Sequence, residues 1–226
     1  MTDASGAPAL VLREVVSRAS DDGWGAPLSV RVERGSFVTL VTTPTPAAGL
    51  MRLLLALDDP AGGTVEVLGE TPHAMRRGAL RRFRRRIGSC LLPDGLMANV
   101  TLRANVALPL VFGDGCSTAE AEARADEVLG QFGLRRWADH RPSDLAPDTR
   151  QVASLARAVS ARPELLILHD PLTSVSNADA VHLLTTSHEY ATTVVAAVHG
   201  EDEAVCLMAD RAIVWDASGI RETARP

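Results

Sequence analysis

Residues 164–199 read ELLILHDPLTSVSNADAVHLLTTSHEYATTVVAAVH. The stretch opens with an apolar run at 164–169 and closes with another at 192–198, and each run has the length of a buried strand. Between them, residues 177–190 are expected to form a helix. Strands that are apolar throughout and alternate with helices are typical of a parallel sheet covered on both faces. The stretch therefore predicts an α/β fold.

The flanking segments extend this pattern. A helix is expected around 149–161, and the last strand of the chain near 211–215. An apolar helix is expected over 50–57, with Pro46 in its first turn. Towards the N-terminus, Gly, Pro and Asp separate four short runs that together predict an antiparallel β element. These runs cover residues 9–16, 28–33, 36–41 and 64–68.

Two helices are expected in the middle of the chain. Residues 73–86 read HAMRRGALRRFRRR and form a basic helix or helical turn. Ser117 and Glu120 have the spacing of a capping box, which predicts a helix that runs to about Phe132.

The length and composition are those of a single domain that needs no disulfide bonds to stabilise its core. The chain has 226 residues, of which 46% are hydrophobic, and this length can bury a core. Its net charge of −5 argues against a nucleic-acid-binding domain. Cys90, Cys116 and Cys206 lack the spacing of a disulfide framework, which favours a protein that resides in the reducing cytosol. Neither a secretory signal nor a membrane span is expected, so any membrane link requires a partner.

Short stretches in a fixed order resemble the ATP-binding subunits of ABC transporters over nearly the whole chain. The likeness is greatest to the branch that serves lipoprotein export, cell division and macrolide export. No stretch is specific alone, but their order and spacing are specific in combination. They are Leu57-Asp58-Asp59-Pro60, Gly62-Gly63-Thr64-Val65, Gly69, Arg85-Arg86-Ile87-Gly88, Asn105-Val106-Ala107-Leu108-Pro109-Leu110, Ala156-Arg157-Ala158, Arg162-Pro163-Glu164-Leu165-Leu166, Pro171 and Ala209-Asp210-Arg211.

The resemblance implies an ABC cassette of the P-loop NTPase type. Such a cassette has a mostly parallel sheet flanked by helices, an N-terminal antiparallel β element and an inserted helical subdomain. Residues 1–226 are expected to form one nucleotide-binding domain, with the helical subdomain at about 95–160. The family uses ATP and magnesium, and its cassettes pair head to tail on a membrane permease.

The family's phosphate loop falls on residues 41–48, where nearly all of its pattern is replaced. The pattern G-x-x-x-x-G-K-[ST] surrounds the phosphates with backbone N–H groups, a lysine and a metal-binding hydroxyl. Here valine and proline stand at the glycine positions, and alanine stands at the lysine and hydroxyl positions. Two prolines also remove backbone donors. The residues are Val41, Thr42, Thr43, Pro44, Thr45, Pro46, Ala47 and Ala48.

Two further family motifs are replaced. The glutamine that senses the metal and the attacking water falls on Leu92. The signature, whose glycines present N–H groups to the partner's nucleotide, falls on Ala146, Pro147 and Asp148. Asp148 would place a negative charge against phosphate.

Three candidate catalytic residues remain, and they are expected to cluster where the strands of open α/β sheets end. His169 stands at the position of the magnesium-holding aspartate, Asp170 at that of the general-base glutamate, and His199 is the retained switch histidine. The three are a plausible transition-metal set. Alternatively, they hydrogen-bond one another as remnants of a catalytic centre. Because no ligand spacing independent of the fold supports a metal, none is predicted.

Seven arginines form the strongest charge cluster. They could bind nucleic acid or anionic lipid. We favour a solvated helix that flanks the permease-docking loop, because the rest of the chain is acidic and no aromatic stacking set accompanies the arginines. They are Arg76, Arg77, Arg81, Arg82, Arg84, Arg85 and Arg86.

The replaced motifs favour a pseudo-ATPase, a degenerate cassette subunit that docks on a membrane permease in a structural or regulatory role. ATP hydrolysis and a bound cofactor are not expected. The expected partners are a permease, contacted around residues 92–102, and a second cassette that is either identical or intact, but no nucleic acid. The subunit would be cytoplasmic and peripheral to the membrane. The alternatives are an active or weakly active ATP-binding and ATP-hydrolysing subunit, and a binding module built on the basic patch.

Overall fold

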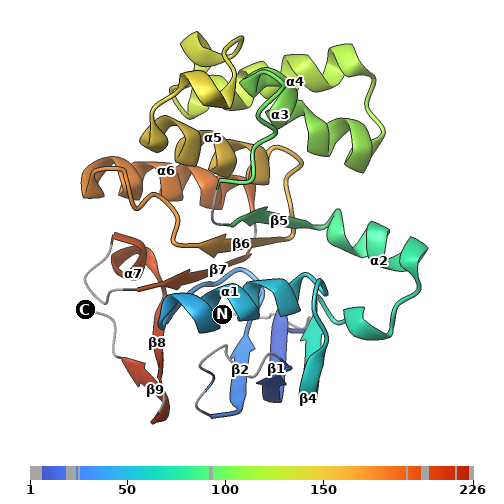
Figure 1. Ribbon diagram of the computed structural model, residues 1–226, viewed down its shortest axis with the longest axis vertical. Coiled ribbons are helices and arrows are strands. Elements are labelled where there is room, and N and C mark those ends of the chain that lie inside the picture. The colour runs from blue at the N-terminus through green and yellow to red at the C-terminus, as the bar shows by residue number, and fades with distance from the viewer. Residues whose placement is uncertain are drawn as a thin grey trace, which may run out of the picture.

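A six-stranded sheet forms the centre of the computed structural model (Figure 1). The structure describes residues 7–18, 24, 26–91, 94–191, 193–199, 204–216 and 218–223. The strands lie in the order β5-β6-β7-β3-β8-β9, and neighbours run parallel except β8 and β9. Their bounds are β5 (Ile87–Cys90), β6 (Leu165–His169), β7 (Thr193–Val198), β3 (Phe37–Val41), β8 (Arg211–Asp216) and β9 (Gly219–Thr223).

Both faces of this sheet are covered, which confirms the predicted α/β class. Successive residues of a strand point to opposite faces, and alternate residues of β7 belong to two different cores. One core lies between the sheet and helices α5 (Pro147–Val159) and α6 (Asn177–Tyr190). The other core contains helix α1 (Pro44–Leu54), which lies on the opposite face. Pro46 lies in the first turn of α1, as predicted.

A smaller antiparallel sheet has the order β2-β1-β4, with β1 (Leu10–Ser17), β2 (Leu28–Val32) and β4 (Pro60–Val67). The prediction that residues 36–41 belong to this element was wrong, because β3 joins the larger sheet between β7 and β8. All five residues of β3 are buried, whereas β2 alternates between buried and exposed residues. Burial on both faces suits a covered parallel sheet, and alternation suits a sheet with one exposed face.

Helices α3, α4 and α5 gather at the end of the molecule opposite the smaller sheet (Figure 1). The predicted capping box opens α4: the Ser117 hydroxyl accepts from the Glu120 N–H, and the Glu120 carboxylate accepts from the Ser117 N–H at 3.0 Å. The elements are α3 (Leu102–Pro109), η2 (Leu110–Asp114), α4 (Thr118–Gln131), η3 (Arg135–Trp137) and η4 (Pro142–Asp144), followed by α5.

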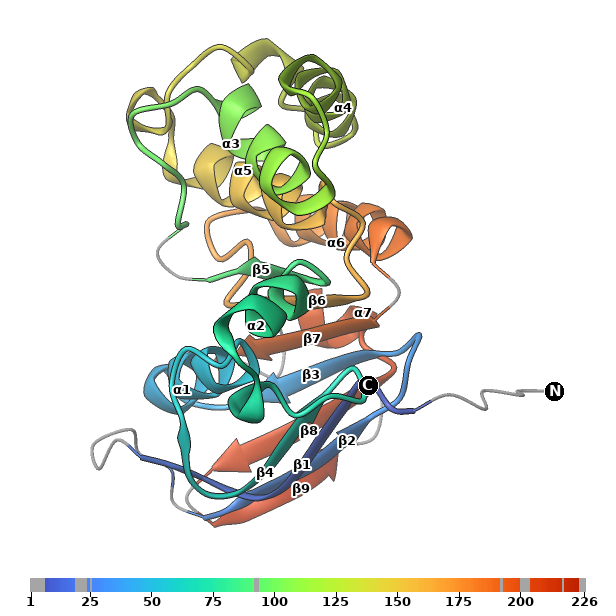
Figure 2. The same ribbon diagram turned by 90° about the vertical axis from the view of Figure 1, so that its right-hand side faces the viewer.

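Other elements differ from the prediction. The basic segment forms a short turn, η1 (Pro72–Ala74), and a separate helix, α2 (Arg77–Arg84). The strand near 211–215 is not the last, because β9 pairs with β8 after it (Figure 2). Helix α7 (Ala204–Met208) precedes β8. In the described ranges, no helix has both the length and the apolar character that a membrane crossing requires.

Candidate functional site

Three neighbouring strands of the larger sheet end at one edge, and the candidate residues follow them. His169 of β6 pairs with Ala197 of β7, and Val41 of β3 pairs with Val198 of β7. The Asp170 N–H donates to the Ala197 carbonyl at 2.8 Å. This register brings the candidate catalytic residues and the first residue of the phosphate-loop segment to the same edge.

Residues 41–48, the expected degenerate phosphate loop, consist of the end of a strand, a short connection at 42–43 and the start of a helix. Val41 ends β3, and α1 already begins at Pro44. Proline is suited to the first turn of a helix, because its φ angle is preset and the missing N–H would have no helical partner. The Ala47 N–H donates to the Thr43 carbonyl at 3.2 Å as an ordinary helix bond. Most of the segment is therefore the start of α1, and two of its residues are prolines without a backbone N–H.

The side chains of this segment do not fit magnesium ATP as the family pattern binds it. Val41 and Ala47 are 6% and 0% exposed, so they belong to the core. Ala47 and Ala48 offer only methyl groups where the pattern places an ammonium and a hydroxyl. Of the remaining residues, Thr43, Pro44 and Thr45 are exposed and Pro46 is buried. The whole chain contains no lysine, so no lysine elsewhere can replace the missing one.

His169, Asp170 and His199 lie together, as the strand order predicted. Oδ1 of Asp170 is 2.5 Å from Nδ1 of His199, and its Oδ2 is 3.4 Å from Nε2 of His169. Asp170 is 1% exposed, whereas the His199 side chain is 32% exposed. Burial, together with the nearby His199, lowers the pKa of His169. Burial thus favours the uncharged form of His169.

The other predicted positions lie elsewhere. Ala146 precedes α5, and Pro147 and Asp148 form the first turn of that helix. All three are exposed, and the Asp148 carboxylate accepts from the Thr149 N–H at 2.6 Å. A proline and a carboxylate thus stand where the signature has glycine N–H groups. Leu92, the predicted glutamine position, lies outside the described residues.

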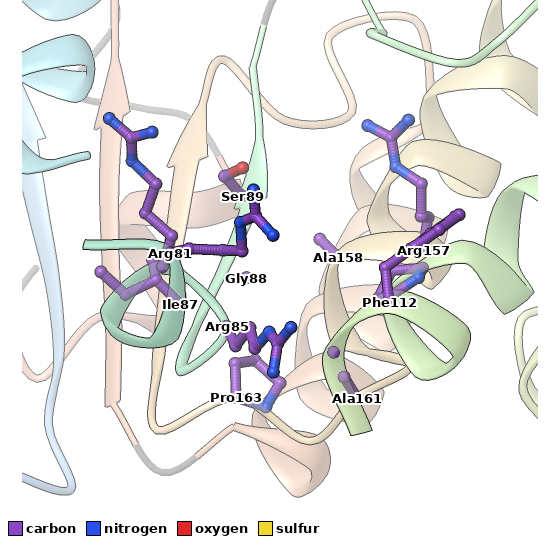
Figure 3. Close-up of a pocket in the computed structure, with 13 residues that line it drawn as sticks. Arg81, Arg85, Ile87, Gly88, Ser89, Phe112, Arg157, Ala158, Ala161 and Pro163 are labelled. Atoms are coloured by element: carbon purple, nitrogen blue, oxygen red, sulfur yellow. The ribbon is translucent and has the colours of Figure 1, made fainter. Parts of the chain in front are cut away.

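Sequence reasoning did not find a cavity of about 520 Å³ between α2, β5 and α5. Figure 3 shows Arg157 and Phe112 on the opposite side of this cavity from β5, and Arg81 and Arg85 also line it. Phe112 is 70% exposed. Its isolation in the sequence, in the Gly-containing segment after α3, is the only signal that could have pointed to it.

Two of the clustered arginines stabilise the fold rather than face solvent. Arg84 donates to the carbonyl oxygens of Leu55 and Ala56, at 2.8 and 2.7 Å, just after α1 ends. Arg86 pairs with Glu164 at 2.5 Å and also with Glu70. Hydrogen bonds from Arg86, and more weakly from Arg34, lower the pKa of Glu164 to about 2 against the opposing effect of burial. The prediction of a freely solvated basic helix holds for only part of the cluster.

Comparisons with known proteins agree on one family. The family described as ABC transporter matches residues 28–173. Methionine import ATP-binding protein MetN 2 of Pseudomonas aeruginosa is 32% identical over 177 residues, which are 76% of this chain and 52% of that protein. MetN 1 of Pseudomonas putida is 31% identical over 201 residues, 87% of this chain and 60% of that protein. The chain thus spans only 52% and 60% of the length of these relatives.

Solved structures show the same fold. The dimeric ATP-binding cassette MJ0796, in a post-hydrolysis state bound to ADP and Pi, has a TM-score of 0.84 and 23% identity. The match covers 96% of this chain and 99% of that one. CbiO1 from Clostridium perfringens, part of an ABC transporter complex, has a TM-score of 0.78, 18% identity, and coverage of 97% and 89%.

These matches contradict the expectation that the chain has no cofactor. The expectation rested on individual motif residues, whereas the family match spans residues 28–173 and the relatives are ATP-binding proteins by name. ATP with magnesium is the cofactor of the family. The replaced residues show less than that: at positions 47 and 48, alanines stand where the family's pattern has the lysine and the metal-binding hydroxyl.

Proposed function

The chain belongs to the ABC transporter family, and we propose that it serves there as a cassette subunit that docks on a membrane permease and does not hydrolyse ATP. In this role it contributes structure or regulation to a transporter, at the cytoplasmic face of the membrane. The permease and a second cassette, identical or intact, are its proposed partners.

The single observation that carries the proposal is that residues 41–48 lack the lysine and the metal-binding hydroxyl of the family's pattern, in a chain without any lysine. Hydrolysis in P-loop enzymes depends on positioning the phosphates and on neutralising their charge. Here helix α1 begins at Pro44, and a fully buried alanine stands at the lysine position. Losing one oriented donor at a reacting group typically costs about 10²–10³ in rate. The combined loss of the lysine, the hydroxyl and two proline N–H groups supports a subunit without turnover.

The cavity between α2, β5 and α5 supports the docking part of the proposal. Its exposed Phe112 offers an apolar anchor, and Arg81 and Arg85 offer positive charge beside it. Arg157 donates to the Gly95 carbonyl at 2.6 Å, which connects the cavity to the surface after residue 92 where docking was expected. Aromatic and arginine side chains of this kind are enriched among the residues that dominate protein interfaces.

Co-expression with the permease encoded beside this chain, and with any intact cassette encoded there, tests both parts. We expect the three to co-purify, and Phe112→Ala together with Arg85→Glu to release this subunit. The ATPase rate of the complex should be unchanged by Asp170→Ala and His199→Ala in this chain. Loss of the rate with those changes, or retention of the Phe112→Ala, Arg85→Glu variant in full, would contradict the proposal.

A further inference from the structure

We propose that His169, Asp170 and His199 form a binding site for a transition-metal dication such as Zn²⁺. One ligand atom from each residue lies within 4.8 Å of the other two. Imidazole nitrogens and carboxylate oxygens are ligands that zinc takes. His169 stands at the position of the family's magnesium-holding aspartate, but the two imidazoles change the ion that the site suits, because magnesium prefers oxygen ligands and keeps several waters.

One of the two ligand–ligand distances already suits a tetrahedral metal, and the other requires a small movement. Zinc binds nitrogen and oxygen at about 2.0–2.1 Å, which places neighbouring ligand atoms of a tetrahedron about 3.3 Å apart. His169 Nε2 lies 3.4 Å from Asp170 Oδ2. His199 Nδ1 lies closer, 2.5 Å from Asp170 Oδ1, and has to withdraw by roughly 1 Å to share a metal. The His199 side chain is 32% exposed and follows the end of β7, so it is the ligand of the three that packing restrains least.

The buried nitrogen of His169 is an independent observation that points to a ligand. Nε2 is buried and makes no hydrogen bond with any residue in the described part of the chain. The His169 side chain is only 8% exposed, so water has little access to it. A buried polar atom without a hydrogen bond lowers stability, and a metal ion would satisfy this nitrogen.

The backbone holds two of the ligands in place. His169 ends β6, and the Asp170 N–H donates to the Ala197 carbonyl of β7 at 2.8 Å. Asp170 has a φ of 42°, a left-handed conformation that few non-glycine residues adopt. Such conformations persist only where the surroundings enforce them, and they cluster at functional sites. The half-exposed His199 leaves a route from solvent, and three protein ligands leave one tetrahedral position for water or an anion.

The test uses the full chain after treatment with a chelator and desalting, without ATP. Co²⁺ is titrated while its visible absorption is recorded, and Zn²⁺ is then added in competition. We expect one metal per chain, with the strong absorption of four-coordinate Co²⁺. Asp170→Asn and His199→Gln should each weaken binding at least about tenfold, the low end of what even an outer-shell change costs. Cys116→Ser should leave binding unchanged, because the half-buried Cys116 thiol is not a proposed ligand.

Matched controls are available on α6, where His182 and His188 are exposed and lie outside the cluster. His182→Gln and His188→Gln should bind Co²⁺ like the unchanged chain. Circular dichroism of each variant checks folding, and the exposed position of His199 makes its variant the safest to compare. The proposal would be overturned if the unchanged chain did not bind Co²⁺. It would also be overturned if Asp170→Asn and His199→Gln bound Co²⁺ as tightly as the controls. Because ATP is absent, neither result bears on hydrolysis.

Discussion

Oδ1 of Asp170 lies 2.5 Å from Nδ1 of His199. The parallel pairing of β6 and β7 brings the residues together, because each follows the end of its strand. We infer that this contact helps to hold the ends of β6 and β7 together.

Introducing a lysine at the family's position should not create an ATPase. Ala47 is 0% exposed, so the ammonium of Ala47→Lys would be forced into the core, or α1 would have to shift. We expect the free energy of unfolding to fall by about 3 kcal/mol or more, with no gain in phosphate release. Ala48→Lys is the matched control, because Ala48 is only half-buried and its ammonium can reach solvent. Equal stability of the two variants would contradict the packing of α1 described here.

The Glu164 carboxylate should stabilise the fold above pH 4.5 and lose that effect as the pH falls. Its pKa in the folded chain is about 2, below the ordinary 4.5. A folded-state pKa that is depressed stabilises the protein above the unfolded pKa, and the contribution disappears as the folded pKa is approached. The difference corresponds to about 3 kcal/mol, but the side chain is 40% exposed, so screening reduces the expected effect to about 1 kcal/mol.

Urea unfolding of the unchanged chain and of Glu164→Gln, from pH 2 to pH 7, measures this contribution. The two curves should differ by about 1 kcal/mol near neutral pH and converge towards pH 2. A difference that stays constant down to pH 2 would show that packing, and not the pairing with Arg86, accounts for the effect.

Arg84 and Arg81 should differ in their effect on stability although both belong to the basic cluster. Arg84→Ala removes two hydrogen bonds to the carbonyl oxygens after α1, and we expect a loss of about 1–2 kcal/mol. Arg81 is exposed, and Arg81→Ala should change stability by no more than about 0.5 kcal/mol. Thermal unfolding measures both, and equal values would mean that the carbonyl contacts contribute nothing.

Gly88 should be irreplaceable on packing grounds. A Cβ atom at this position would lie 2.1 Å from the Ala158 carbonyl oxygen and 2.9 Å from Pro163. Gly88→Ala must therefore separate β5 from α5, at a cost of about 2 kcal/mol or more. Gly130 in α4 has no atom within 4 Å of the corresponding position, and Gly130→Ala should stabilise the helix by up to about 1 kcal/mol. A neutral Gly88→Ala variant would contradict the close approach.

Much of the fold could be predicted from local patterns. The apolar runs at 164–169 and 192–198 became β6 and β7, and the capping box at Ser117 opened α4. Residues 36–41 were misassigned because a short apolar run does not reveal which sheet it joins. That choice depends on non-local pairing with Val194–Val198. The final strand, β9, was missed because its residues GIRET are polar and lack the apolar alternation of a half-buried strand.

The site was predictable in its members but not in its geometry. The motif positions correctly placed His169, Asp170 and His199 at neighbouring strand ends. The contact distances, and the buried nitrogen of His169, depend on side-chain packing across two strands and have no signature in the sequence. Likewise, the pattern at 41–48 revealed the missing groups, but only the structure places the start of α1 at Pro44.

The central claim, that this cassette does not hydrolyse ATP, is tested most directly by phosphate release from ATP in the presence of magnesium. The measurement compares the purified chain with the same chain carrying both Asp170→Ala and His199→Ala. If the account is correct, both release phosphate at the same rate, indistinguishable from buffer. A rate above buffer that falls to background in the double variant would contradict the account, because Asp170 and His199 would then be catalytic residues of a working ATPase.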